Sequence, residues 1–313
     1  MTNAKEIKKR IKSIGNTKKI TKAMEMVAAA KMRRSVDAVL RTRTYANLSW
    51  ATLLNISSSL KGETSLHPLL EKRAKVEKEL IVLIASNRGL CGGFNSAIIN
   101  KAVKSARMHA TKTDFITIGK RGESVRKRFG FEVISEFIKP DTNPNSSEVS
   151  AVAKQIIDDF LAKKYDKVLL AYTDFVSPIK QVPRIRQILP VDINAEDEYL
   201  GAIGKSEKIA TNKDLIKEKE EKYLSGNALF KYEPDEREVL DLILPRLIEV
   251  QLFQGLLESN ASEHSARMAA MHQASSAASD LVDELTLSYN KARQAAITAE
   301  IAEISAGAAV LNG

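Results

Sequence analysis

Apolar residues recur at helical spacing along the first sixty residues of the chain. These positions are Ile7, Ile11, Ile14, Val36, Leu40 and Leu53. No glycine or proline interrupts the sequence between Asn16 and Lys61. The pattern predicts one helix over residues 3–60, which at 1.5 Å per residue would be roughly 85 Å long. Gly62 and Pro68 are expected to end it.

One part of this predicted helix has no polar face. Residues 23–30 read AMEMVAAA, and Glu25 is their only charged side chain. At 3.6 residues per turn, their small and apolar side chains surround the whole helix axis. A surface helix normally keeps a polar side. We therefore expect this stretch to be covered by protein on more than one side.

The last third of the chain predicts a second long helix. Pro-Asp-Glu at 234–236 is a helix-start signal, and no glycine or proline occurs between residues 256 and 306. Pro245 and Gly255 are expected to bend its first turns. Residues 265–279 are rich in Ala and Ser, whose small size allows close helix contact. Because neither helix has a strict heptad repeat, the pattern predicts a loosely wound antiparallel pair.

Short β-rich segments alternate with helical segments between the two long helices. Strands are predicted at residues 78–86, 114–120, 130–137 and 166–175, and helices at 95–110, 121–129 and 147–164. This alternation is typical of a mostly parallel sheet. Residues 180–191 contain Pro183, which favours an edge strand.

The predicted fold is therefore α/β plus long helices. The two ends form an antiparallel helical hairpin (coiled coil), into which a mostly parallel, Rossmann-like α/β domain is inserted. The predicted segments are an N-terminal shaft helix at 1–62, the α/β domain at 76–195, a charge-mixed insertion at 196–231 and a C-terminal shaft helix at 232–313.

Charge is distributed unevenly along the chain. The net charge is +9, yet residues 1–60 contain 13 Lys or Arg against three acids, and residues 256–313 contain seven acids against three basic residues. The two ends could therefore complement each other. Nucleic-acid binding by the basic helix is an alternative, but aromatic interleaving is missing and residues 23–30 offer no cation for phosphate tracking.

Composition restricts the chemistry that the chain can perform. Its only cysteine, Cys91, excludes an internal disulfide, and the four histidines show no metal-ligand spacing. The loop at 86–95 lacks both a G-x-G-x-x-G pattern and a Gly-Lys-Ser/Thr ending, so nucleotide binding is disfavoured against a tight structural turn. Cys91 would need a histidine base to act as a nucleophile, and a buried small side chain is the favoured interpretation. An α/β enzyme that uses Cys91 or a nucleotide is a third alternative.

Targeting signals are also missing from the sequence. No apolar run approaches the roughly 18 residues of a membrane span. The first ten residues, MTNAKEIKKR, lack the apolar centre of a secretory signal. We therefore expect a chain that reaches a membrane only through a partner.

Four segments resemble gamma subunits of F-type ATP synthases, in the order found in that family. They are residues 5–34, 84–95, 261–275 and 288–311. The resemblance extends over nearly the whole chain, but residues 195–231 look longer than in short bacterial members. Chloroplast relatives carry a regulatory cysteine pair in an inserted segment. Because Cys91 is alone, such a dithiol switch is excluded here.

The resemblance implies a non-catalytic rotor shaft without a cofactor. The hairpin is expected inside a ring of alternating alpha and beta subunits, and the α/β domain on the membrane c-ring beside the epsilon subunit. One copy per complex would turn and drive three beta sites through states of different nucleotide affinity. No nucleic acid or small-molecule substrate is implied. Since the family signature starts at the initiator region, the expected location is the cytoplasmic face of a bacterial inner membrane, as a peripheral subunit.

The resemblance also assigns residues to contacts. Beta-subunit contacts are expected at Met24, Lys31, Arg33, Arg34, Arg293, Gln294 and Thr298, where Thr298 follows Gln294 by one helical turn. Shaft packing is expected at Val27, Arg267 and Met268, and an apolar bearing tail at Ile304, Val310 and Leu311. Ordinary hairpin packing of Met24 and a frayed, merely uncharged terminus are the alternatives.

Overall fold

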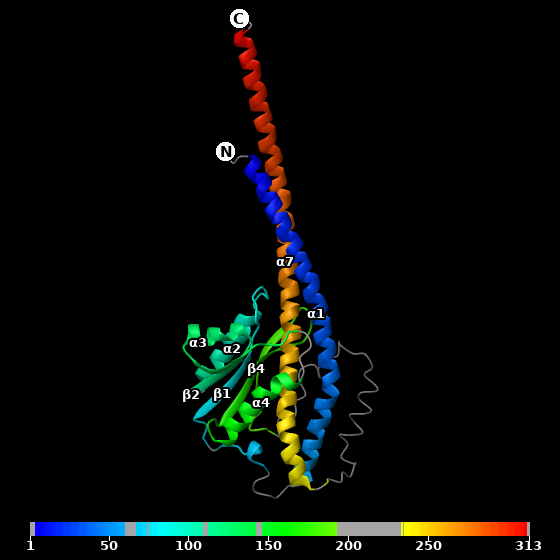
Figure 1. The fold of residues 1–313 in the computed structure, drawn as a ribbon, viewed down its shortest axis with the longest axis vertical. Coiled ribbons are helices and arrows are strands. Elements are labelled where there is room, and N and C mark those ends of the chain that lie inside the picture. The colour runs from blue at the N-terminus through cyan, green and yellow to red at the C-terminus, as the bar shows by residue number, and fades with distance from the viewer. Residues whose placement is uncertain are drawn as a thin grey trace. The chain divides into compact units, whose positions relative to one another are not determined.

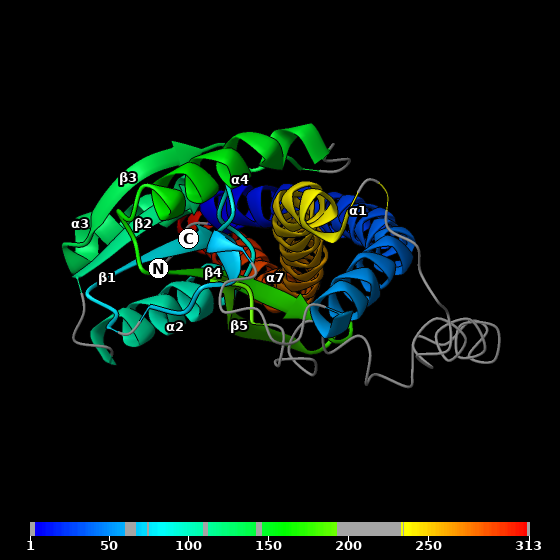
Figure 2. The same cartoon turned by 90° about the horizontal axis from the view of Figure 1, so that it is seen from below.

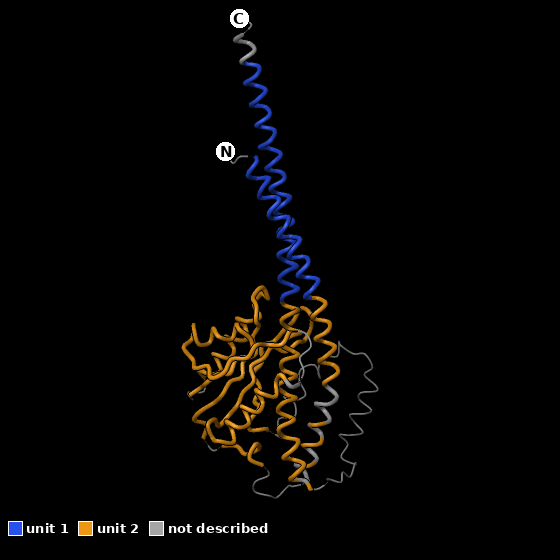
Figure 3. The backbone as a smooth tube through the Cα atoms, viewed as in Figure 1, with its two compact units in different colours: residues 1–28, 267–313 blue, residues 29–266 orange. Residues whose placement is uncertain are grey.

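The computed structural model describes residues 4–59, 67–73, 75–108, 112–141, 146–192, 233 and 235–311. The chain divides into two compact units, shown in Figure 3. Unit 1 comprises Met1–Ala28 with Arg267–Gly313, and unit 2 comprises Ala29–Ala266. The boundary falls within both long helices, so it differs from the four predicted segments. The predicted insertion at 196–231 lies outside the described residues.

Two long helices, α1 (Ala4–Ser59) and α7 (Glu236–Leu311), contain 56 and 76 residues. The bounds of α1 lie within one residue of the prediction. Asp235 caps the start of α7, because its Oδ1 accepts hydrogen bonds from the N–H groups of Arg237 at 2.8 Å and Glu238 at 2.9 Å. Pro245 lies inside α7 and does not end it.

The two long helices pack against each other and run antiparallel. In unit 1, Lys18 of α1 donates to the Ser279 hydroxyl of α7 at 2.9 Å, and further along α1 the Glu25 carboxylate lies 3.2 Å from His272 of α7. Residue numbers in unit 1 therefore rise along α1 as they fall along α7. In unit 2 the two helices also share an apolar cluster. The predicted antiparallel hairpin is confirmed.

The α/β domain contains a five-stranded sheet with the order β3-β2-β1-β4-β5. The strands are β1 (Lys78–Ile84), β2 (Lys112–Ile118), β3 (Glu132–Phe137), β4 (Lys167–Phe175) and β5 (Gln181–Leu189). The first four are parallel, whereas β5 pairs antiparallel with β4 at one edge. An edge tolerates Pro183, which cannot donate a main-chain hydrogen bond. The prediction of a mostly parallel sheet is confirmed.

Helices cover both faces of this sheet (Figures 1 and 2). Residues of α2 (Phe94–Met108) and α3 (Ser124–Phe129) share one apolar core with the sheet. The other core contains side chains of α4 (Ser146–Leu161), α1 and α7. Short 3₁₀ turns, η1 (Pro68–Leu70) and η2 (Lys120–Glu123), complete the described elements. Because both faces are covered, β1 is buried from its second residue onward.

The turn after β2 requires glycine. Gly119 has a φ of 107°, and a Cβ there would lie 2.2 Å from the main-chain oxygen of Ala85. We expect Gly119→Ala to lower the free energy of unfolding by about 3 kcal/mol, through backbone strain and overpacking. Gly93→Ala is the control, since its Cβ would meet nothing closer than Ser96 Oγ at 3.9 Å. Urea denaturation of the two variants checks this, and equal stabilities would contradict it.

Candidate functional site

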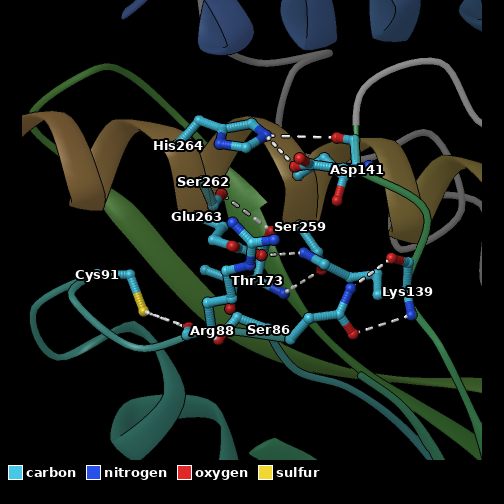
Figure 4. A network of polar contacts seen from close by, with 12 residues as sticks. Ser86, Arg88, Cys91, Lys139, Asp141, Thr173, Ser259, Ser262, Glu263 and His264 are labelled. Atoms are coloured by element: carbon cyan, nitrogen blue, oxygen red, sulfur yellow. Dashed lines mark hydrogen bonds and ion pairs between the residues drawn. The ribbon is translucent and has the colours of Figure 1, made fainter. Parts of the chain in front are cut away.

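A run of buried polar side chains lies on α7 where this helix passes the α/β domain (Figure 4). We call it the polar belt, and its members are Ser259, Asn260, Ser262, Glu263, His264 and Ser265. Taken as whole residues, none of them is more than 5% exposed. Burying polar groups costs free energy unless they are hydrogen-bonded. Their partners therefore show what the belt does.

Two serines of the polar belt continue the hydrogen bonding of the sheet. The Ser259 hydroxyl accepts from the main-chain N–H of Thr173 at 3.2 Å, and Ser262 donates to the main-chain oxygen of Thr173 at 3.1 Å. The pairing of β1 with β4 ends at Leu83 opposite Ala171. Thr173 lies two residues beyond that point, and α7 satisfies its main-chain groups instead of β1. The shaft helix is thus joined directly to a central strand.

A buried ion pair joins the polar belt to the segment after β3. Lys139 and Glu263 are paired, with side chains only 3% and 6% exposed. The Lys139 ammonium also lies 5.6 Å from the centre of the Phe94 ring. Next to the pair, the Asn260 amide donates to the main-chain oxygen of Pro140 at 3.1 Å. Since an unpaired buried charge is costly, this pair resists separation of the domain from α7.

Asp141 connects the same segment to both long helices within unit 2. Its carboxylate pairs with Lys31 of α1 and lies 3.3 Å from Nε2 of His264 on α7. Burial raises the pKa of Asp141, but the hydrogen bond and charge of Lys31 outweigh it, and the pKa is lowered overall. Burial lowers the pKa of His264, which the nearby acids only partly offset. At neutral pH Asp141 is therefore charged and His264 is neutral.

The loop that follows β1 also contacts the segment after β3. Asn87 donates to the main-chain oxygen of Lys139 at 2.6 Å and accepts from the N–H of Lys139 at 3.1 Å. Within the loop, Asn95 accepts from the N–H of Ser86 at 2.9 Å and donates to Cys91 Sγ at 3.2 Å. Cys91 is 2% exposed. The loop thus uses its polar groups for internal support, and Cys91 is buried as the favoured interpretation expects.

The predicted beta-contact residues of α1 differ in exposure. Met24 is half-buried, and Lys31 is engaged by Asp141 of the same chain. Arg33 and Arg34 are exposed. Of the three basic positions, these two arginines present their side chains outward.

The predicted shaft-packing positions also differ from one another. Val27 is 55% exposed, whereas its neighbour Ala28 is 2% exposed and occupies the buried position. Met26 is 60% exposed, so residues 23–30 keep an apolar outer face. Arg267 and Met268 are partly buried.

Every residue of α7 from 293 to 306 is exposed. Arg293, Gln294 and Thr298 all lie in this stretch, and the Thr298 hydroxyl donates to the main-chain oxygen of Gln294 at 2.9 Å. Apolar side chains are also uncovered there: Ile297 is 48%, Ile301 59% and Ile304 67% exposed. The predicted tail residues Val310 and Leu311 have side chains outside the described set.

The polar belt is not among the features predicted from the sequence. Residues 265–279 were expected to make helix contacts because they are rich in Ala and Ser, and residues 261–275 entered only through the family resemblance. The available signal was the run SNASEHS at 259–265, which places polar side chains at every angle of a predicted long helix. A surface helix would keep apolar residues on one side.

The helices and the acidic, histidine and cysteine side chains can be compared with the needs of a membrane span and of a metal site. Within the described ranges, each helix lacks an uninterrupted apolar stretch of the length that a membrane span requires. Among the same residues, no three His, Cys, Asp or Glu side chains converge as a metal site.

Comparisons with known proteins agree over the whole chain. A family model described as ATP synthase matches residues 3–311. Proteins named ATP synthase gamma chain from Chloroflexus aurantiacus and Herpetosiphon aurantiacus are 39% and 41% identical, and each comparison covers all of both chains. A solved central stalk and c-ring of the Tetrahymena thermophila mitochondrial ATP synthase matches with a TM-score of 0.58 and 26% identity, over 82% of this chain and 99% of that one.

A second solved structure shares the fold. It belongs to the Euglena gracilis mitochondrial ATP synthase and matches with a TM-score of 0.63 at 17% identity, over 98% of this chain and 94% of that one. Fold and polar belt together define a helical-shaft protein that carries an inserted α/β domain. The chain belongs to the ATP synthase gamma-chain family. This membership confirms the predicted resemblance and the predicted role as a non-catalytic shaft subunit.

Proposed function

We propose that the chain is a central rotor shaft that transmits torque through the polar belt. The observation that carries this proposal is the chain of contacts from β4 and the segment after β3 to both long helices. Torque applied to the α/β domain reaches the helices only if the two move together. Buried, mutually paired polar groups resist sliding because any displacement leaves them unsatisfied.

The partners of such a shaft are the alpha and beta subunits around the hairpin, and the epsilon subunit and c-ring at the α/β domain. Turning an asymmetric shaft presents a different surface to each beta subunit in turn. Each beta site is thereby shifted between states of different nucleotide affinity, a population shift imposed by contact. The chain itself does no covalent chemistry in this scheme.

The exposed apolar positions of unit 1 support a bearing role. Ile297, Ile301 and Ile304 lie uncovered on one helix, and a lone helix of this kind is marginal in water. An apolar sleeve formed by the surrounding ring would cover them. We place the beta contacts at Met24, Lys31, Arg33, Arg34, Arg293, Gln294 and Thr298. Of the small residues 28–30, Ala30 is exposed and Ala29 partly exposed, and these two would turn past the ring with few directional contacts to break, whereas Ala28 is buried in the hairpin.

A bacterial inner membrane is the proposed location, with the chain on its cytoplasmic face as a peripheral subunit. Family membership supports attachment through an ATP synthase complex. The proposed attachment is through the α/β domain, which stands on the c-ring.

Reconstitution with alpha and beta subunits tests the proposed function. The chain is expected to co-purify with them as one copy in a complex that hydrolyses ATP. ATPase activity of the isolated chain, together with failure to enter the complex, would contradict the proposal. A salt-dependent shift of duplex DNA by the chain, with no assembly, would instead favour the nucleic-acid alternative.

A lysine at position 24 is expected to impair coupling. Met24 is half-buried on α1 in the proposed beta-contact region. The family resemblance implies an acidic loop of the beta subunit opposite Met24. The added cation would attract this loop and slow its release, since one charge-assisted contact is worth about 1.5–3 kcal/mol. ATP-driven proton pumping per ATP hydrolysed is expected to fall several-fold. Met24→Leu, which keeps the position apolar and of similar volume, is the control. Unchanged pumping in Met24→Lys would mean that Met24 serves only in hairpin packing.

A further inference from the structure

Two buried carboxyl groups meet beside the polar belt. Asp174 of β4 is 0% exposed, and Glu258 of α7 is 7% exposed. Asp174 follows Thr173, whose N–H donates to Ser259, the residue after Glu258, so both carboxyl groups lie at the same point of the contact between β4 and α7. Burial raises the pKa of both groups, and the charge of Asp174 raises the pKa of Glu258 further. Two ionised carboxylates in this site would repel each other, and neither would have a proton to donate. A single proton shared between them would remove the repulsion and supply a hydrogen-bond donor.

The surrounding charges decide which group carries that proton. Arg184 Nε of β5 lies 2.7 Å from Asp174 Oδ2, which favours the ionised form of Asp174. Arg186 and Arg184 also favour the ionised form of Glu258, but burial and the charge of Asp174 outweigh them. Arg186 of β5 lies nearby, with its guanidinium 5.9 Å from the centre of the Tyr172 ring. The proton belongs on Glu258.

Unsatisfied oxygens point to the same arrangement. Asp174 Oδ1 and Glu258 Oε2 are both buried without a hydrogen-bond partner. A buried acceptor left unpaired costs free energy. A protonated Glu258 can donate to Asp174 and satisfy one of these acceptors, whereas two ionised groups would leave both unsatisfied and repelling.

We propose that Asp174 and Glu258 form a binding site for one shared proton, which fastens β4 to α7. The site lies where α7 passes close to β4. A Cβ on Gly255, one turn before Glu258, would lie 2.7 Å from Leu170 Cδ2 of β4. One residue after Glu258, Ser259 accepts from the N–H of Thr173. Loss of the proton places a second negative charge in this seam and weakens the attachment of the domain.

The sign of the pH dependence follows from Glu258. Burial raises its pKa from the ordinary 4.5 to about 8, and the Asp174 charge adds to this, while Arg186 and Arg184 oppose it. The folded chain then holds a proton that the unfolded chain releases. Its stabilising contribution is complete below about pH 4.5 and is lost as the pH rises through about 8. Tyr172 of β4 stays protonated in this range, because burial raises its pKa.

Thermal unfolding of the full chain at about pH 6 and about pH 9 tests the site. Glu258→Gln keeps the shape and can still donate to Asp174, so it removes the titration without removing the contact. From the lower to the higher pH, the wild-type midpoint is expected to fall by about 3 °C or more relative to that of Glu258→Gln. Glu284→Gln, on an exposed part of α7, should behave as the wild type does.

Infrared spectroscopy provides a readout independent of stability and of the proposed function. The wild-type chain should show the carbonyl band of a protonated carboxyl group that disappears with a midpoint near pH 8. Glu258→Gln should lack this band. The proposal is overturned if the wild type shows no such band, or if wild type and Glu258→Gln lose stability equally with rising pH.

Discussion

Glu263→Ala is expected to lower the free energy of unfolding of the full chain by about 3–5 kcal/mol. The substitution leaves the Lys139 ammonium in a site where its side chain is only 3% exposed. A buried cation without its partner retains the desolvation cost and loses the attraction that offset it. The effect should be one of the largest available from a single change in unit 2.

A matched control separates burial from simple charge removal. Arg126 and Glu136 form an ion pair on the surface, with side chains 50% and 44% exposed. Glu136→Ala should cost less than about 1 kcal/mol. Urea denaturation of both variants gives the comparison. Equal costs would mean that the polar belt does not hold the domain through its buried pair.

The same variant has an expected effect on function. If the belt transmits torque, an assembled complex that contains Glu263→Ala should hydrolyse ATP but pump fewer protons per ATP.

Replacing both members of the Lys139–Glu263 pair, as in Lys139→Met with Glu263→Met, should recover much of the lost stability, because neither charge of the pair remains.

The second large effect is expected at the exposed end of α7. Ile301→Asp combined with Ile304→Asp should change the stability of the isolated chain by less than about 0.5 kcal/mol, because both side chains are more than half exposed. In a complex, the two carboxylates would have to enter an apolar sleeve, at a cost of several kcal/mol if they remain unpaired. Assembly or coupled activity should fall at least about tenfold.

Ile301→Val with Ile304→Val is the control for this tail prediction. It keeps the tail apolar and should assemble as the wild type does. Comparing yields of the alpha, beta and shaft complex distinguishes the outcomes. Normal assembly and coupling of the aspartate variant would leave a frayed, uncharged terminus as the better description of the tail.

Most of the fold could be predicted because its signals are local. A long stretch without glycine or proline marks α1 to within a residue, and Asp235 marks the start of α7. Alternating strand and helix patterns give the parallel sheet, and Pro183 indicates the edge strand β5. In each case the residues that determine the helix or strand lie within it or a few residues away from it.

The polar belt could not be predicted in this way, because its partners are distant in sequence. Lys139 and Glu263 are 124 residues apart, and Asp174 meets Glu258 across the seam between β4 and α7. Each residue read alone suggests a solvated surface. Only the crossing of α7 over the sheet makes them neighbours.

Helix phase explains why Ala28 is buried on α1 whereas Val27, the predicted packing residue, is exposed. The sequence marks residues 23–30 as apolar all round, but it does not fix which side meets α7. A shift of one residue rotates a helix by about 100°. That rotation buries Ala28 and leaves Val27 exposed. The partner subunits were predicted from the family resemblance, because the hydrophobic pattern of one chain does not identify the proteins that surround it.

The most direct test is to observe whether this chain turns while the ring hydrolyses ATP. Cys91 is 2% exposed, so Ile179→Cys, at a position that is 96% exposed, provides a selectively reactive thiol on the α/β domain. A bead attached there, with the alpha and beta ring fixed to a surface, is expected to rotate in one direction when ATP is added. ATP hydrolysis by complexes whose bead stays still, with the label shown to be attached, would contradict the account.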